Sequence, residues 1–136
     1  MAESKSTAPT NEDYRRLAAF RYALRRFLHF SEDAARTAGI SPNQYQLLLF
    51  VRGFNGTPPT IGELAEQLQI EHQSAVGLVD RSESGGLVAR KRDPKDRRRV
   101  RISLTPKGAA VLRRLVRVHS PELDKLSSAL FRIPAA

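Results

Sequence analysis

The first part of the chain carries a helical pattern of apolar residues. Between residues 12 and 38, apolar side chains recur every three or four positions, with pairs of arginines between them. Acidic residues at the start of this segment and Gly39 at its end are typical helix boundaries. A Ser-Pro-Asn-Gln sequence at 41–44 predicts the start of a second helix, which ends near Gly53. The buried stripe predicted for this second helix consists of Tyr45, Leu48 and Leu49.

Two shorter helices are predicted in the middle of the chain. The paired prolines at 58–59 cannot continue a helix, because proline lacks the backbone N–H group that a helix needs. The Thr-Ile-Gly-Glu sequence at 60–63 is a capping box and predicts a helix to about Leu68. After a tight connection at 69–71, a further helix is predicted over residues 72–84.

The pattern then changes from a helical period to strand alternation. Residues 87–92 and 100–104 predict two strands, the second with strictly alternating apolar and polar residues. The Asp-Pro-Lys-Asp sequence at 93–96 has the chemistry of a turn. The two strands are therefore expected to form a hairpin with a basic tip.

Helical periodicity returns in the last part of the chain. A helix is predicted from Thr105, with an interruption at Ser120 and Pro121. A last short helix is predicted between residues 123 and 130.

The composition is that of one folded domain. The chain has 136 residues, of which 40% are hydrophobic, enough to build one core. It contains no cysteine, which excludes disulfides, zinc-thiolate sites, iron–sulfur clusters and a thiol-oxidation switch within this chain. It has no apolar run of about 18 residues and no apolar centre near the N-terminus, so we expect a cytoplasmic protein without a membrane span.

The position of the charge is more informative than its total of +9. Residues 81–117 hold 13 lysines and arginines against 3 acidic residues, and 8 of those bases fall within residues 90–101. A concentrated block of this kind creates a local positive field suited to a polyanion. The alternative is an ordinary solvated face, which a charge run often forms.

The order of the predicted elements favours the polyanion-binding alternative. A short helix, a tight turn, a second helix and a basic hairpin form the layout of a winged helix-turn-helix. The second helix of this layout fits the major groove of DNA. Arginines at the hairpin tip can reach phosphates or the electronegative minor groove. The predicted fold is mainly α with a small β-hairpin wing.

Several segments of this layout resemble the MarR family of transcriptional regulators. The ordered set comprises residues 60–65, 77–81, 86–88, the Arg-Asp-Pro-Lys-Asp-Arg-Arg run at 92–98, and Leu-Thr-Pro-Lys-Gly at 104–108. The resemblance covers residues 12–131. It implies that the first and last helices interlock into a homodimer whose winged domains straddle a palindromic operator in double-stranded DNA.

The corresponding domain organisation has four segments. These are a flexible tail at 1–10, an N-terminal dimerisation helix at 11–40, a winged helix-turn-helix DNA-binding domain at 41–104, and C-terminal dimerisation helices at 105–136. The function implied is a sequence-specific regulator, a repressor relieved by a small-molecule ligand. Two alternatives remain open: a nonspecific architectural DNA-binding protein, and a basic module that docks an acidic protein partner.

The candidate DNA contacts follow from this layout and from the resemblance. On the recognition helix they are His72, Gln73, Ser74, Gly77 and Arg81, with Gln73 able to pair with adenine. On the wing they are Arg92, Lys95, Arg97, Arg98 and Arg99, of which Arg98 matches the arginine of the family's Asp-x-Arg motif that enters the minor groove. Asp80 and Asp96 are expected to orient the wing and its arginines.

The sequence offers little support for an enzyme or a metal site. The three histidines, His29, His72 and His119, are isolated, with no metal-ligand spacing, and no phosphate-binding glycine loop is present. We expect no cofactor. By the resemblance, an effector pocket would lie where the first, second and fifth helices meet the winged domain, with Tyr22, Tyr45 and Phe54 as candidate linings. Because the absence of cysteine excludes a thiol-oxidation switch, two possibilities remain: the protein senses a small-molecule ligand, or it senses no signal.

Overall fold

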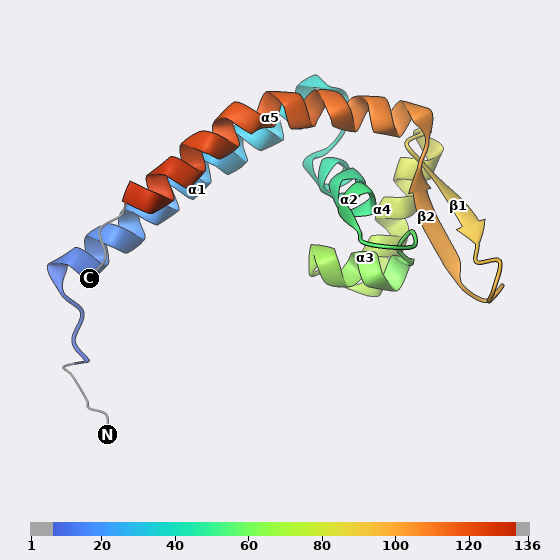
Figure 1. Ribbon diagram of the computed structural model, residues 1–136, viewed down its shortest axis with the longest axis horizontal. Helices are drawn as coiled ribbons and strands as arrows, with labels where there is room; N and C mark the ends of the chain where they lie inside the picture. The colour runs from blue at the N-terminus through green and yellow to red at the C-terminus, as the bar shows by residue number, and fades with distance from the viewer. Residues whose placement is uncertain (1–6, 133–136) are drawn as a thin grey trace.

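The structure, a computed structural model, describes residues 7–132 and the side chains of residues 7–128. Five helices and one antiparallel hairpin make up the described chain (Figure 1). In order they are α1 (Asn11–Thr37), α2 (Pro42–Gly53), α3 (Ile61–Leu68), α4 (His72–Ser84), β1 (Val88–Arg92), β2 (Val100–Leu104) and α5 (Pro106–Arg132). The mainly α fold with a hairpin wing that the sequence predicts is confirmed.

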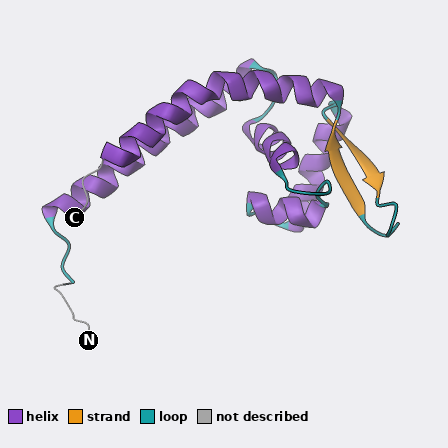
Figure 2. Ribbon diagram, in the orientation of Figure 1, coloured by secondary structure: helices purple, strands orange, loops and turns teal. Residues whose placement is uncertain are grey.

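The elements form two parts of different shape. α1 and α5 run side by side along much of their length and form a long arm (Figure 1). α2, α3, α4 and the hairpin gather under one end of this arm (Figure 2). The helix-turn-helix and the hairpin therefore lie together, away from the free end of the arm.

Three of the helices begin at the capping boxes that the sequence predicts. The side chains of Thr10, Ser41 and Thr60 each accept a hydrogen bond from the backbone N–H group three residues later. The side chain of that later residue accepts a bond from the backbone of the capping residue in return. Local hydrogen bonding thus marks where α1, α2 and α3 start.

The core lies between α2 and the elements of the winged unit. Its fully buried side chains include Leu47 and Leu48 of α2, Leu64 of α3, Val79 of α4 and Ile102 of β2. The prediction of Leu49 as a buried residue was wrong, since its side chain is 38% exposed. The reason is that α1, α3, α4, α5 and β2 all contact α2, which widens its buried face to include Leu47 in place of Leu49.

The hairpin is joined to the rest of the winged unit along β2. Its strands pair from Val88 with Leu104 to Arg92 with Val100. The residues just before α3 form an extension beside β2, where the backbone N–H group of Ile102 donates to the carbonyl of Pro59 at 2.8 Å. The wing is therefore attached through its second strand to the start of the helix-turn-helix.

The predicted interruption of the last helix was wrong. α5 continues through Pro121, although proline cannot donate a hydrogen bond to the carbonyl one turn earlier. Packing along α1 supports the helix at this point, and the Ser120 hydroxyl donates to the Val116 carbonyl at 3.1 Å. A proline inside a helix can kink it without ending it.

Two further predictions concern the ends of the chain and the membrane. The tail predicted at residues 1–10 falls largely on residues 1–6, which lie outside the described residues, and Thr10 is the N-cap of α1. Residues 133–136 also lie outside them. Within residues 7–132, no helix combines the length and the apolar character needed to cross a membrane.

Candidate nucleic-acid interface

The fourth helix turns one face to the core and the other to solvent. α3 ends at Leu68, and the left-handed backbone of its C-cap residue Gln69 (φ 56°) reverses the chain before α4 begins. The buried side chains of α4 are Ala75, Leu78, Val79 and Ser82. The exposed candidates for DNA contact are His72, Gln73 and Ser74 in the first turn and Arg81 in the last. The tight turn and the apolar face together hold the first turn of α4 in solvent.

The N-terminus of α4 differs from those of α1, α2 and α3. Glu71 is its N-cap residue, and its side chain makes no capping hydrogen bond. The first N–H groups of a helix have no partner within the helix, and the helix dipole places partial positive charge there. The start of α4 can therefore donate to an anion without first losing a side-chain cap.

Gly77 lies beside Arg81 on the surface of α4. A β-carbon at Gly77 would lie 3.2 Å from the Nη1 atom of Arg81. The guanidinium group thus lies back over the glycine, one turn earlier in the helix. The absence of a side chain at residue 77 gives Arg81 room to lie along the helix surface.

The basic residues predicted for the wing gather around its tip. The hairpin is closed by the N–H group of Asp93, which donates to the carbonyl of Arg99 at 2.9 Å. The exposed bases are Arg92, Lys95, Arg97, Arg98 and Arg99. Within residues 7–132, Lys95, Arg97 and Arg99 form no ion pair with an acidic side chain, so their charges remain available to a polyanion.

Asp96 and Arg98 are in direct contact at this tip. The Nε atom of Arg98 donates to Oδ1 of Asp96 at 3.1 Å, and the backbone N–H group of Arg98 donates to the same oxygen at 3.2 Å. The Arg98 side chain and then its backbone N–H group hold the pKa of Asp96 below its usual value. The Arg98 side chain is nevertheless 91% exposed, so the pair orients the arginine without burying it.

Asp80 joins the recognition helix to the first strand of the wing. Its Oδ1 atom accepts a hydrogen bond from Nη2 of Arg90 at 2.6 Å, and Glu83 accepts from Nη1 of the same arginine. These two carboxylates, Asp80 first, raise the pKa of Arg90. Arg90 therefore links α4 to β1, and its charge is compensated within the fold.

Two residues of the wing were not singled out from the sequence. Asp93 and Arg101 form an ion pair, with Nε of Arg101 2.9 Å from Oδ2 of Asp93, and both side chains are largely buried. The signal that could have identified them is the scarcity of acids in this basic segment. Each acid there has several cations within reach, but the sequence cannot say which of them it pairs with.

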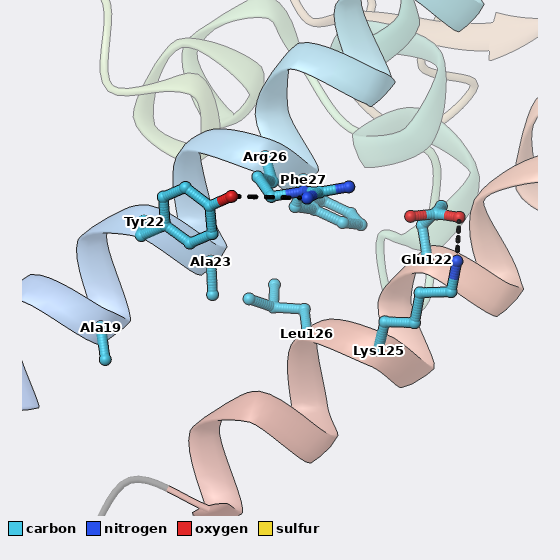
Figure 3. Close-up of a pocket in the computed structure, with 8 residues that line it drawn as sticks. All are labelled: Ala19, Tyr22, Ala23, Arg26, Phe27, Glu122, Lys125 and Leu126. Atoms are coloured by element: carbon cyan, nitrogen blue, oxygen red, sulfur yellow. Dashed lines mark hydrogen bonds and ion pairs between the residues drawn. The ribbon is translucent and has the colours of Figure 1, made fainter.

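The three candidate pocket residues lie in different places. Tyr22 lines a groove of about 440 Å³ between α1 and α5, together with Phe27 and Leu126 (Figure 3). Tyr45 is buried, with its ring stacked on His119 at a centroid distance of 4.8 Å. Phe54 lines a shallow depression beside β2. The structure does not bring the three residues together around one cavity.

The histidines are also separate from one another. His29 and His72 are exposed, whereas His119 is 5% exposed and is packed among the rings of Phe27, Phe30 and Tyr45. Among the described residues, no three histidine or acidic side chains are grouped so that they could hold a metal ion.

Comparison with known proteins connects this geometry to a family. The MarR family model matches residues 38–99, from the end of the arm helix α1 to the tip of the wing. The HTH-type transcriptional regulator YkoM of Bacillus subtilis is 27% identical over 121 residues. That match covers 85% of this chain and 76% of YkoM.

Solved structures share the same architecture. A MarR family protein from Bacillus stearothermophilus is 26% identical and superposes with a TM-score of 0.75, over 88% of this chain and 82% of that protein. The DNA complex of S. aureus MepR has a TM-score of 0.70 at 20% identity, over 82% of each chain, which is a likeness of fold. The arrangement of arm, helix-turn-helix and wing is common to these proteins. Residues 38–99 of the chain match the MarR family model, and the chain as a whole has the fold of the winged helix-turn-helix proteins of that family.

Proposed function

We propose that this regulator binds a palindromic site in double-stranded DNA, with α4 in the major groove and the wing tip at the minor groove. The observation that carries the proposal is that one winged unit, in which α4 contacts β1, has both the exposed first turn of α4 and a hairpin tip with uncompensated positive charge. Gln73 and Ser74 would contact base edges, Arg98 the minor groove, and the neighbouring bases the phosphates. His72 and Arg81 are further candidates for contacts from α4.

The proposed binding unit is a homodimer formed by the arm. What supports it is the apolar surface that the arm leaves in solvent, including Leu17 and Leu28 of α1 and Val118 and Leu123 of α5, which are between 44% and 65% exposed. Large exposed apolar patches mark interaction surfaces. A two-fold dimer would place two α4 helices about 34–36 Å apart, or a multiple of that distance, to match successive major grooves.

The regulator is further proposed to be a repressor that a small-molecule ligand releases. A ligand can change the spacing of the two α4 helices only by its differential affinity for the two arrangements. The open groove between α1 and α5 beside Tyr22 supports such a site, because it lies within the arm that would form the dimer. Tyr45, which is stacked on His119, and Phe54, beside β2, lie outside this groove and are not part of the proposed ligand site.

The deciding experiment selects genomic fragments with the purified protein and then measures competition by random duplex. A specific regulator should bind selected fragments about 10³–10⁷ times more tightly than random DNA. Equal competition by random duplex would instead indicate an architectural DNA-binding protein. A module for acidic proteins would show none of the steep salt dependence that phosphate contacts produce, about −0.9 in log affinity per log salt for each phosphate.

Light scattering tests the dimer separately. The mass in solution should be about twice the 15.2 kDa of one chain. A mass near that of a single chain at micromolar concentration would contradict the proposed arm interface.

A further inference from the structure

Arg101 is the basic residue of the wing that turns inward. It lies in β2 directly opposite Lys91 of β1, and paired residues of an antiparallel hairpin have side chains on the same face. Lys91 is exposed, whereas the Arg101 side chain is only 14% exposed. The two cations therefore share a position on the hairpin but differ in what surrounds them.

The guanidinium group of Arg101 contacts three separate segments. Nε donates to Oδ2 of Asp93 at 2.9 Å, and Nη1 donates to the carbonyl of Pro58 at 2.6 Å. Nη1 also lies 4.0 Å from Oε1 of Glu63, the residue that completes the capping box of α3. One side chain thus joins the wing turn, the connection between α2 and α3, and the start of the helix-turn-helix.

Asp93 links the Arg101 side chain to the backbone of the wing tip. Its Oδ1 atom accepts a hydrogen bond from the backbone N–H group of Lys95 at 2.8 Å, and its own N–H group donates to the carbonyl of Arg99. One carboxylate oxygen therefore shapes the turn while the other is held by Arg101. The Asp93 side chain is 13% exposed, so water competes little for either bond.

We propose that Arg101 is a positioning residue for DNA binding: through Asp93 and the Pro58 carbonyl, it fixes the direction in which the wing tip leaves the helix-turn-helix. The proposal rests on the proposed DNA-binding function. In this arrangement Arg101 makes no phosphate contact, because its charge is paired with Asp93 and its Nε and Nη1 groups donate within the protein. Its loss would let the tip move relative to α4, so that Arg98 and the first turn of α4 no longer reach their grooves together.

The matched pair of variants is Arg101→Met and Lys91→Met. Each removes one positive charge from the same cross-strand pair, but only Arg101→Met removes the contacts to Asp93 and Pro58. In the protein without DNA, hydrogen exchange of the amides of residues 93–99 should accelerate in Arg101→Met and stay at the wild-type rate in Lys91→Met. Equal exchange in both variants would overturn the proposal, whether or not the protein binds DNA selectively.

Binding to a selected duplex gives the second measurement. Arg101→Met should lower affinity by about 2- to 30-fold, the range for residues that act without touching the ligand. A slope of log affinity against log salt reduced by about 0.9, with hydrogen exchange of residues 93–99 unchanged from the wild type, would show that Arg101 neutralises a phosphate directly, and would refute a positioning role. Arg101→Lys, which keeps the charge but lacks the planar fork, should restore only part of the affinity.

Asp93→Asn separates positioning from electrostatics. This variant removes a negative charge from the wing, so electrostatic attraction alone would tighten DNA binding. Our proposal requires the opposite, because the amide cannot hold Arg101 as the carboxylate does. Tighter binding by Asp93→Asn would overturn it, and this variant also keeps the test decisive where Arg101→Met does not fold.

Discussion

Replacing Gly108 with alanine should destabilise the protein, because the structure leaves no space for a β-carbon at this position. Gly108 lies in the first turn of α5, against the backbone of Leu87 at the start of the wing. A β-carbon there would lie 2.0 Å from the carbonyl oxygen of Leu87, 2.9 Å from its carbonyl carbon and 3.2 Å from its Cα atom. Since non-bonded heavy atoms of this kind stay more than about 3 Å apart, α5 and Leu87 must separate by roughly 1 Å.

The cost follows from what holds Leu87. Its side chain is 3% exposed, its N–H group donates to the Ser82 carbonyl at 2.9 Å, and its carbonyl accepts from the Thr105 N–H group at 3.1 Å. Overpacking a well-filled site costs about 1–3 kcal/mol. A weakened backbone hydrogen bond adds about 1 kcal/mol, which the better helix propensity of alanine offsets. The net loss is therefore about 1–3 kcal/mol.

Urea denaturation followed by circular dichroism at fixed protein concentration measures this loss. Gly62→Ala in α3 is the matched control, because the nearest atom to its β-carbon would be the Thr60 hydroxyl oxygen at 3.9 Å. That variant should be neutral, or more stable by up to about 1 kcal/mol. If Gly108→Ala unfolds at the same urea concentration as Gly62→Ala, the reasoning that α5 lies too close to Leu87 for a β-carbon at residue 108 is refuted.

Three other predictions concern the interface. Arg98→Ala should weaken binding to a selected duplex by about 1–3 kcal/mol while the light-scattering mass stays unchanged, and equal affinity in a fluorescence titration would remove Arg98 from the site. Gly77→Ala should raise the urea midpoint, because alanine favours a helix by about 0.5–1 kcal/mol, but it should reduce preference for selected over random duplex by displacing Arg81. Unchanged selectivity would contradict that role for the glycine. The Lys95 N–H group and then Arg101 lower the pKa of Asp93 below 3.8, so its stabilisation is present above that pH and is lost as pH falls through the folded-state pKa. The stability difference between wild type and Asp93→Asn should accordingly shrink on acidification, and a constant difference in urea midpoints would count against it.

Helix starts could be predicted from the sequence because they depend on neighbours. Each capping box is complete within four residues, so Thr10, Ser41 and Thr60 could be identified without knowledge of the fold. The continuation of α5 through Pro121 could not, since it depends on a helix about 100 residues earlier in the chain. The prediction that Leu49 is buried failed for the same reason, because the elements that surround α2 determine which of its sides is buried.

In the candidate site, too, the features that depend on nearby residues could be predicted and those that depend on distant residues could not. A concentration of bases next to a helix-turn-helix is visible in the sequence, and it correctly locates the wing. The sequence does not distinguish Arg98, which is 91% exposed, from Arg101, which is 14% exposed and lies only three positions later. The Arg101 side chain is turned away from solvent because its Nη1 group donates a hydrogen bond to the carbonyl of Pro58, 43 residues earlier. That contact cannot be predicted from the residues next to Arg101 in the sequence.

The distribution of acids explains how such a basic hairpin can fold at all. Like charges placed side by side on a hairpin repel each other, and the cost is greatest where water is excluded. Three of the acids pair with the less exposed bases: Asp80 and Glu83 compensate Arg90, which is 29% exposed, and Asp93 compensates Arg101, which is 14% exposed. At the solvated tip, Asp96 pairs with Arg98, and water screens the remaining bases, so that their compensation is largely unnecessary. The first three acids therefore stabilise the base of the wing and leave most of its positive field at the tip, where a DNA phosphate could supply the missing counter-charge.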